Sequence, residues 1–209
     1  MKKNKITIIN YGMGNIGSIK NMINYLGHEA TISNKKQDIN DSDFLILPGV
    51  GKFDHAMKNI FELNLIDVVR ENALERKIPI LGICLGMQLM CLESEEGKKE
   101  GFSLIDYKVK KFNFSDQTDL KIPHMGWNFL NETPNNLLFK NISGKLRFYF
   151  VHSYYVEDIG LSYKSSTTSY GLDFVSSFEK NNLFGVQFHP EKSHRFGKEL
   201  FKNFLNFYE

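Results

Sequence analysis

Short apolar runs alternate with helix-like segments through the first half of the chain, and this alternation constrains the fold more than any other feature. Residues 5–10, 44–47 and 79–83 are apolar and short enough to be buried strands. Between them, residues 15–26 and 65–77 place apolar side chains at helical spacing. Strands that alternate with helices predict an α/β fold with an open, mainly parallel, twisted sheet and helices on both faces.

The second half of the chain is mostly strand-like and predicts a smaller mixed or antiparallel β part added to that sheet. The expected strands are residues 107–114, 146–156, 165–170, 174–178 and 183–188. Apolar residues at helical intervals predict a closing helix over residues 194–208. The charged stretch 93–100 is expected to be a solvated loop. Since no repeat or long linker divides the chain, residues 1–209 are expected to form a single domain.

Charge and cysteine content exclude several classes of protein. The formal net charge is +2, from 26 basic and 24 acidic residues, which is too balanced to predict a nucleic-acid or membrane partner. No apolar run reaches the roughly 18 residues of a membrane span. The apolar run near the start is too short for a signal peptide, and two cysteines are too few for a disulfide scaffold. A cytoplasmic protein is expected.

The segment Gly82-Ile83-Cys84-Leu85-Gly86 has the form G-x-C-x-G between a predicted strand and a helix expected from residue 86 to about 93. This is the arrangement of a nucleophile elbow, with Cys in place of Ser. Such a sharp turn needs small flanking residues, and the helix that begins there favours the thiolate. The alternative is a small buried side chain. The glycines and the strand-to-helix context favour the nucleophile, whereas Cys91, in an apolar stretch, is expected in the core.

A cysteine nucleophile needs a base close to it in space. His189 follows the strand-like LFGVQF and precedes Pro190, which biases it toward an extended conformation at the strand end. Glu191 is placed to orient its imidazole. Ordinary structural positions are expected for His28, His55 and His194, whereas a structural and a functional role stay open for His124 and His152. No metal-ligand pattern is present, so no metal is predicted.

Two glycine motifs precede the elbow. In the first, Gly49, Val50 and Gly51 follow Pro48 and the strand at 44–47, where a peptide could turn its N–H toward a substrate oxygen. The alternative is a common Pro-Gly turn, but the position one β-α unit before Cys84 favours the oxyanion role.

The second motif, Gly12, Gly14 and Gly17, matches the G-x-G-x-x-G fingerprint and suggests an NAD- or FAD-binding enzyme as a rival. That rival needs an acid at the end of the next strand, and the nearest one is Asp38, beyond the sequence SNKK. A dinucleotide-binding role for this motif is therefore disfavoured.

The motifs PGVG, GICLGMQL and GVQFHPEKS, in this order, resemble the class I glutamine amidotransferases, and the resemblance runs from Asn10 to the closing helix. Two more motifs, PHMGWN at 123–128 and YFVHSYY at 149–155, look like one branch of that family. Members of this branch release ammonia for a cyclase partner of histidine biosynthesis, which yields imidazole glycerol phosphate and an aminoimidazole carboxamide ribonucleotide.

The resemblance implies that Cys84 attacks the glutamine carboxamide, that His189 carries the proton and that Glu191 orients His189. An oxyanion hole is implied at Leu85 and the Gly49–Gly51 loop, with a peptide at Val50 that flips for activity. Glutamine-binding groups are implied at Gln88, His152, Ser153 and Tyr154.

The implied partner is a (β/α)8-barrel cyclase subunit that forms a heterodimer with this chain, and no cofactor is implied. Residues implied to face that partner are Asn15, Trp127, Tyr149 and Lys192. Two alternatives stay open from the sequence. One is a paralogous glutaminase that supplies ammonia for amidation of a surface sugar, and the other is a non-catalytic module that serves only assembly.

Overall fold

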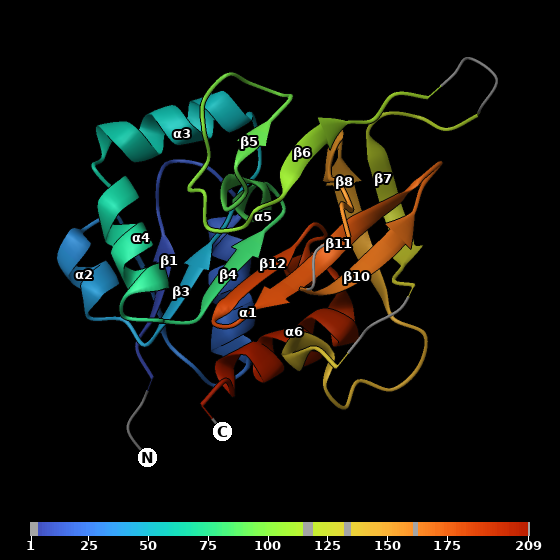
Figure 1. The fold of residues 1–209 in the computed structure, drawn as a ribbon. Helices are drawn as coiled ribbons and strands as arrows, with labels where there is room; N and C mark the ends of the chain where they lie inside the picture. Colours follow the sequence, from blue (N-terminus) through green and yellow to red (C-terminus); the bar gives the residue numbers. More distant parts are fainter. Residues whose placement is uncertain (1–3, 115–118, 132–134, 161–162, 209) are drawn as a thin grey trace.

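The computed structural model describes residues 4–114, 119–131, 135–160 and 163–208 (Figure 1). Its centre is a parallel sheet in the strand order β2-β1-β3-β4-β12. The first four strands come from the first half of the chain, and the fifth comes from near its end. Their bounds are β1 (Ile6–Ile9), β2 (Ala30–Ser33), β3 (Phe44–Leu47), β4 (Ile80–Ile83) and β12 (Leu183–Val186).

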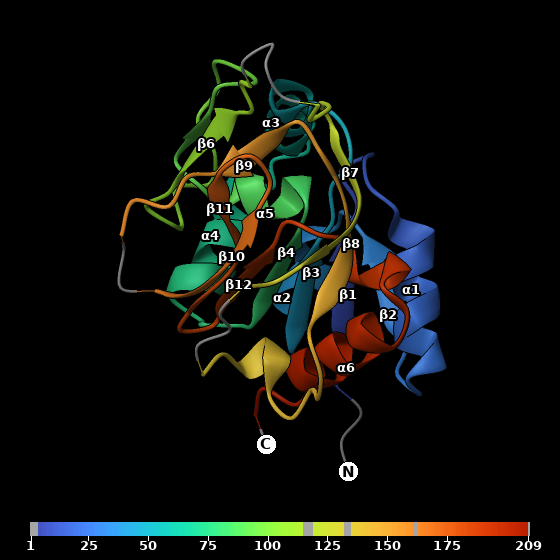
Figure 2. The same cartoon turned by 90° about the vertical axis from the view of Figure 1, so that its right-hand side faces the viewer.

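Helices cover both faces of this sheet because its strands are apolar on both sides. In β3, Phe44 and Ile46 pack into one core, Leu45 and Leu47 pack into the other, and all four are fully buried. Figure 2 shows α1 and α6 on the opposite side of the sheet from α4 and α5. The first core contains α1 (Ile16–Tyr25) and α6 (His194–Leu205); the second contains α2 (Lys36–Asn40), α3 (Phe53–Glu62), α4 (Ile66–Leu74) and α5 (Leu85–Leu89).

The second half of the chain extends the sheet and adds a small one, so the predicted fold class is confirmed. The extension continues antiparallel from β12 to β11, β9 and β6, with β5 parallel to β6 and β10 paired to β11. Strands β7 and β8 form a separate antiparallel pair. The bounds are β5 (Glu93–Ser94), β6 (Lys108–Lys111), β7 (His124–Phe129), β8 (Arg147–His152), β9 (Tyr154–Val156), β10 (Lys164–Ser169) and β11 (Asp173–Lys180), with short 3-10 helices η1 (Leu137–Phe139) and η2 (Pro190–Lys192).

The segment 146–156, predicted as one strand, is broken at Ser153. Its first part, β8, belongs to the small sheet, and its second part, β9, belongs to the large one. Alternation of apolar residues shows that a strand forms, but it does not show which strands it pairs with. The break places residues 152–154 at the junction of the two sheets.

The region after the elbow also differs from expectation. The helix α5 ends at Leu89 and not near residue 93, because the chain at 102–104 folds back and donates its backbone N–H groups to the carbonyls of residues 89–91. The stretch 93–100 is not wholly a solvated loop, since Glu93–Ser94 form β5 and Ser94 is buried. Helices α2 and α3 and strand β7 were not predicted. None of the helices in the described ranges is long and apolar enough to cross a membrane.

Candidate active site

Cys84 lies in the sharp turn that joins β4 to α5. Its φ is +54°, in the left-handed region that non-glycine residues seldom adopt. Such strain persists only where the surroundings enforce it. A Cβ atom at Gly86 would lie 1.8 Å from the carbonyl oxygen of Leu47, and one at Gly82 would lie 2.7 Å from the sulfur of Met90. The two glycines therefore allow the close packing that holds Cys84 at the carboxyl end of β4.

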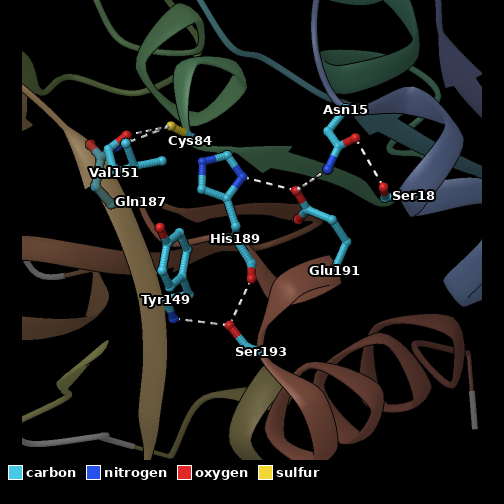
Figure 3. A network of polar contacts seen from close by, with 9 residues as sticks. All are labelled: Asn15, Ser18, Cys84, Tyr149, Val151, Gln187, His189, Glu191 and Ser193. Atoms are coloured by element: carbon cyan, nitrogen blue, oxygen red, sulfur yellow. Dashed lines mark hydrogen bonds and ion pairs between the residues drawn. The ribbon is translucent and has the colours of Figure 1, made fainter. Parts of the chain in front are cut away.

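His189 and Glu191 are brought to Cys84 because β12 runs parallel to β4 and the chain leaves both strands at the same edge. The Nδ1 of His189 lies 2.9 Å from Oε1 of Glu191, and both side chains are buried. The imidazole lies between the carboxylate and Cys84 (Figure 3), and its Nε2 has no hydrogen-bond partner within the described residues. This is the order nucleophile, base and orienting acid that acyl transfer requires.

The protonated form of His189 is favoured by its neighbours. Burial alone lowers the pKa of His189, but the negative charge of Cys84 and the hydrogen bond and charge of Glu191 outweigh burial and raise this pKa to about 10. A cysteine thiolate and a histidine imidazolium stabilise each other as an ion pair in such a site. The resting site therefore holds a proton on His189, ready for a leaving group.

Asn15 contacts the carboxylate of Glu191. Its Nδ2 lies 3.4 Å from Oε1 of Glu191, and its Oδ1 accepts a 2.9 Å hydrogen bond from Ser18. Sequence reasoning assigned Asn15 to a partner interface, and no local pattern links it to Glu191, which is 176 residues away.

A cavity of about 240 Å³ opens beside Cys84. Two of the expected oxyanion-loop residues, Val50 and Gly51, line it together with Leu85. Gly49 packs behind them, since a Cβ there would lie 2.6 Å from Leu85 and from the N of Gly86. The remaining lining residues include every expected glutamine-binding position and three others: Gln88, Glu96, Pro123, Val151, His152, Ser153 and Tyr154.

Glu96 is a pocket residue that sequence reasoning missed, because its charged surroundings are typical of a solvated loop. It is half-buried and accepts a 2.9 Å hydrogen bond from the backbone N–H of Phe53. Burial raises the pKa of this carboxyl, partly offset by the hydrogen bond from Phe53. A carboxylate in the same cavity as Cys84 suits a substrate that carries an ammonium group.

The two histidines with open roles are buried and bonded to each other. Nδ1 of His124 lies 2.9 Å from Nε2 of His152, whose Nδ1 donates to the carbonyl of Tyr154 at 2.7 Å. Burial lowers the pKa of His124 to about 4 and that of His152 to about 3, so both are neutral near pH 7. They support the pocket wall at residues 152–154. Of the remaining three, His55 and His194 are exposed and His28 is half-buried. In the described part of the chain, no group of three or more potential ligands is arranged to hold a metal ion.

The other three residues assigned to a partner lie close together at the surface beside His189. Trp127 is 41% exposed and stacks on His194, with ring centroids 5.4 Å apart. The ring of Tyr149 lies 6.2 Å from that of Trp127, and Nζ of Lys192 lies 5.8 Å from the Tyr149 ring.

The G-x-G-x-x-G segment packs against the PGVG turn. A Cβ at Gly14 would lie 3.0 Å from the Cβ of Pro48, and the hydroxyl of Tyr11 donates to the Pro48 carbonyl. The glycines at 12 and 14 have positive φ. They serve turn geometry and close packing, which favours this explanation over a dinucleotide site.

Comparison with known proteins agrees with this geometry. A family model described as glutamine amidotransferase class-I matches residues 7–207. The protein named imidazole glycerol phosphate synthase subunit HisH 2 of Methanococcus maripaludis is 50% identical over 200 residues, covering 96% of this chain and 98% of the relative. The protein of the same name from Pseudomonas aeruginosa is 43% identical over 205 residues, covering 96% and 98%.

Solved structures share the fold at low sequence identity. A crystal structure of a glutamine amidotransferase superposes with a TM-score of 0.74 at 20% identity, covering 96% of this chain and 97% of the other. The PurLQS structure from Thermotoga maritima gives a TM-score of 0.71 at 18% identity, covering 99% and 100%.

Proposed function

The chain belongs to the class-I glutamine amidotransferase family, and from this premise we propose that it is the glutaminase subunit of imidazole glycerol phosphate synthase. It hydrolyses glutamine to glutamate and ammonia, and the ammonia passes to a (β/α)8-barrel cyclase subunit in histidine biosynthesis. The observation that carries this proposal is the buried His189–Glu191 pair beside a cysteine held at φ +54° in a nucleophile elbow. Relatives at 43–50% identity over nearly the full chain carry that subunit's name.

The geometry supports a two-step acyl transfer. The Cys84 thiolate attacks the side-chain amide carbon of glutamine, and the N–H of Leu85 stabilises the developing oxyanion as a free donor in the first turn of α5. The amide nitrogen takes the proton of His189 and leaves as ammonia, which gives a γ-glutamyl thioester. Water then gives a proton to His189, attacks the thioester carbon and expels the thiolate, which releases glutamate.

The pocket offers groups for the amino-acid end of glutamine. Both amide hydrogens of Gln88 are donated within the protein, to the carbonyl of Tyr154 at 3.1 Å and to the side-chain oxygen of Gln187 at 2.9 Å. Only Oε1 of Gln88 is left for the substrate, and as an acceptor it suits an ammonium group. We assign the α-ammonium of glutamine to Gln88 and Glu96, and the α-carboxylate to backbone N–H groups at Ser153 and Tyr154.

The exposed face of β7 suits a protein partner. Three side chains of β7, Met125, Trp127 and Phe129, are 62%, 41% and 39% exposed and share one face of the strand. Lys145 and Arg147 lie over the rings of Phe129 and Trp127, at 4.2 and 5.3 Å. An apolar stripe with basic neighbours fits a partner that presents apolar and acidic groups, and we assign it to the cyclase.

The deciding experiment is ammonia release from glutamine by the purified chain, alone and then with the histidine-pathway cyclase and its ribonucleotide. We expect low release alone and a steep rise with both present. Ammonia release that does not change when this cyclase is added would indicate that the ammonia goes to another acceptor, such as the surface-sugar pathway. No release under either condition would favour a module that serves only assembly.

Replacement of the nucleophile separates the two half-reactions. Cys84→Ala is expected to abolish glutamine-dependent synthesis in the complex and to leave synthesis from added ammonium salts intact, because the cyclase needs ammonia and not the thiol. Both rates are measured in the same complex as formation of imidazole glycerol phosphate. Loss of the ammonium-driven rate as well would show that the two activities are not divided between the subunits as proposed.

A further inference from the structure

Gln187 is a buried polar residue beside the nucleophile that the mechanism above does not use. It follows β12 directly, is fully buried, and lies two residues before His189. Its Nε2 lies 3.6 Å from Sγ of Cys84, within hydrogen-bond distance for sulfur (Figure 3). A buried amide needs hydrogen-bond partners, so its neighbours fix its orientation.

The orientation of the Gln187 amide follows from a backbone carbonyl. The carbonyl of Tyr154 is only an acceptor, so the Gln88 atom 3.1 Å from it is the amide nitrogen. The second hydrogen of that nitrogen points to the Gln187 atom 2.9 Å away, which must therefore be the oxygen. The other end of the Gln187 amide, next to Cys84, is then the NH₂ group. A donor therefore faces the sulfur.

The sulfur has a different partner for each of its two protonation states. As a thiol it can donate to the carbonyl of Val151, which lies 3.9 Å away. As a thiolate it can only accept, and Gln187 supplies an N–H for it. A hydrogen bond to the charged form of a group favours that form.

We propose that Gln187 is a positioning residue that donates a hydrogen bond to the Cys84 sulfur and holds it as the thiolate beside His189. Gln88 and the Tyr154 carbonyl lock the donor in place, so the wall of the glutamine pocket and the reactive sulfur share one hydrogen-bond chain. This inference rests on the proposed function, in that Cys84 is taken as the nucleophile.

The test measures the reactivity of the sulfur without glutamine. Iodoacetamide alkylates thiolates, and mass spectrometry follows Cys84 and Cys91 separately. Cys91 is fully buried, so its labelling reports unfolding. In Gln187→Glu, an isosteric change that replaces the donor with an acceptor, we expect alkylation of Cys84 to slow. A pH series measures the effect, which is expected to reach about tenfold on the acid side of the profile, where a one-unit loss of thiolate stability lowers the thiolate fraction tenfold. The kcat for glutamine is expected to fall with it, and KM to stay near that of the wild type.

A matched control lies at the other end of the same strand. Asn182 precedes β12, is buried, and donates to the carbonyls of Ala73 and Ile78. Asn182→Asp makes the same chemical change away from the sulfur, and is expected to keep the wild-type alkylation rate at Cys84 whatever it does to stability. If Gln187→Glu exposes Cys91, Gln187→Met removes the donor without adding a charge and is expected to slow alkylation of Cys84 as well.

Wild-type alkylation of Cys84 in a folded Gln187→Glu or Gln187→Met variant would overturn the proposal. So would a defect confined to KM, because that would mean that Gln187 acts only through the pocket wall. Slowed alkylation with no ammonia release from any form of the protein would support the proposed role of Gln187 as a donor to Cys84. The same result would reject the proposed glutaminase activity. Normal ammonia release with unchanged alkylation in the Gln187 variants would reject the donor role of Gln187 and leave the proposed glutaminase activity standing.

Discussion

At the scale of single residues, the two carboxylate oxygens of Glu191 differ in their hydrogen bonding. Oε1 of Glu191 receives both the imidazole and the amide of Asn15, while Oε2 is buried with no hydrogen-bond partner within the described residues. A buried carboxylate with an unpaired oxygen is costly, and a charged neighbour offsets that cost. The Glu191 carboxylate and the His189 imidazolium therefore stabilise each other.

The two residues are expected to differ in their effect on the rate. Glu191→Gln keeps an oxygen that can accept from Nδ1 of His189, so it removes the charge but not the proton carrier. His189→Ala removes the carrier itself. We expect His189→Ala to lower kcat for glutamine by roughly a thousandfold or more, and Glu191→Gln to lower it at least about tenfold less. Steady-state ammonia release in the activated complex measures both, and an equal or larger loss from Glu191→Gln would show that its role is misassigned.

At the scale of elements, the nucleophile turn depends on how closely α5 approaches β3. The approach is set by Gly86, whose absent side chain leaves room for the Leu47 carbonyl. Gly49 makes the reciprocal contact from the Gly49–Gly51 loop, the proposed oxyanion loop. The elbow and the loop are thus one packed unit, and a change in one displaces the other.

Two helical glycines give opposite expectations for the same substitution. Gly86→Ala places a methyl group 1.8 Å from Leu47 O, so the free energy of unfolding is expected to fall by about 1–3 kcal/mol or more. Gly17→Ala, in α1, meets nothing within 4 Å and is expected to raise it by up to about 0.5–1 kcal/mol through the lost flexibility of glycine. Urea unfolding measures both variants. A neutral Gly86→Ala would mean that the contact is not required.

At the scale of the whole molecule, buried histidines link stability to pH. His124 and His152 join the small sheet to the wall of the pocket, and the Asn128 amide continues the chain at 3.2 Å from the far nitrogen of His124. Each ring donates from Nδ1 and accepts at Nε2, which is possible only while both are neutral. Protonation of either ring breaks the chain.

The sign of the pH effect follows from the lowered pKa values. In the unfolded chain these two histidines become protonated near pH 6.5. In the folded chain the pKa is about 4 for His124 and about 3 for His152, so both stay neutral to lower pH. Their contribution to stability is complete above pH 6.5 and is lost as the pH falls. Between pH 6 and 5 the free energy of unfolding is expected to fall by up to about 2.7 kcal/mol per pH unit from the pair.

Substitution of one histidine isolates this contribution. His124→Gln keeps hydrogen-bonding groups but removes one titrating ring, so about half of the slope due to the pair is expected to disappear between pH 6 and 5. His189 does not add to the slope there, because its raised pKa keeps it protonated in the folded state and the unfolded state is also largely protonated. Urea unfolding at pH 7, 6 and 5 gives the slopes, and an unchanged slope in His124→Gln would contradict the assignment.

Local pattern determined the parallel sheet and the three residues proposed for catalysis. Apolar runs and helical spacing mark β1, β3 and β4 because these strands are buried on both faces. The elbow at Cys84 and the pair His189 and Glu191 each lie within a short stretch, so residue type and spacing were enough to find them. Helix α3 is equally local, and its apolar face was open to the same reasoning.

Only the tertiary structure decided what meets across long sequence distances. It divided residues 146–156 between two sheets and shortened α5, because strand partners and backbone acceptors came from distant segments. It also placed Glu96 in the pocket, Asn15 on Glu191 and Gln187 on Cys84. Charge and polarity in sequence do not show which neighbour a side chain will find, because that neighbour is set by the packing of the whole sheet.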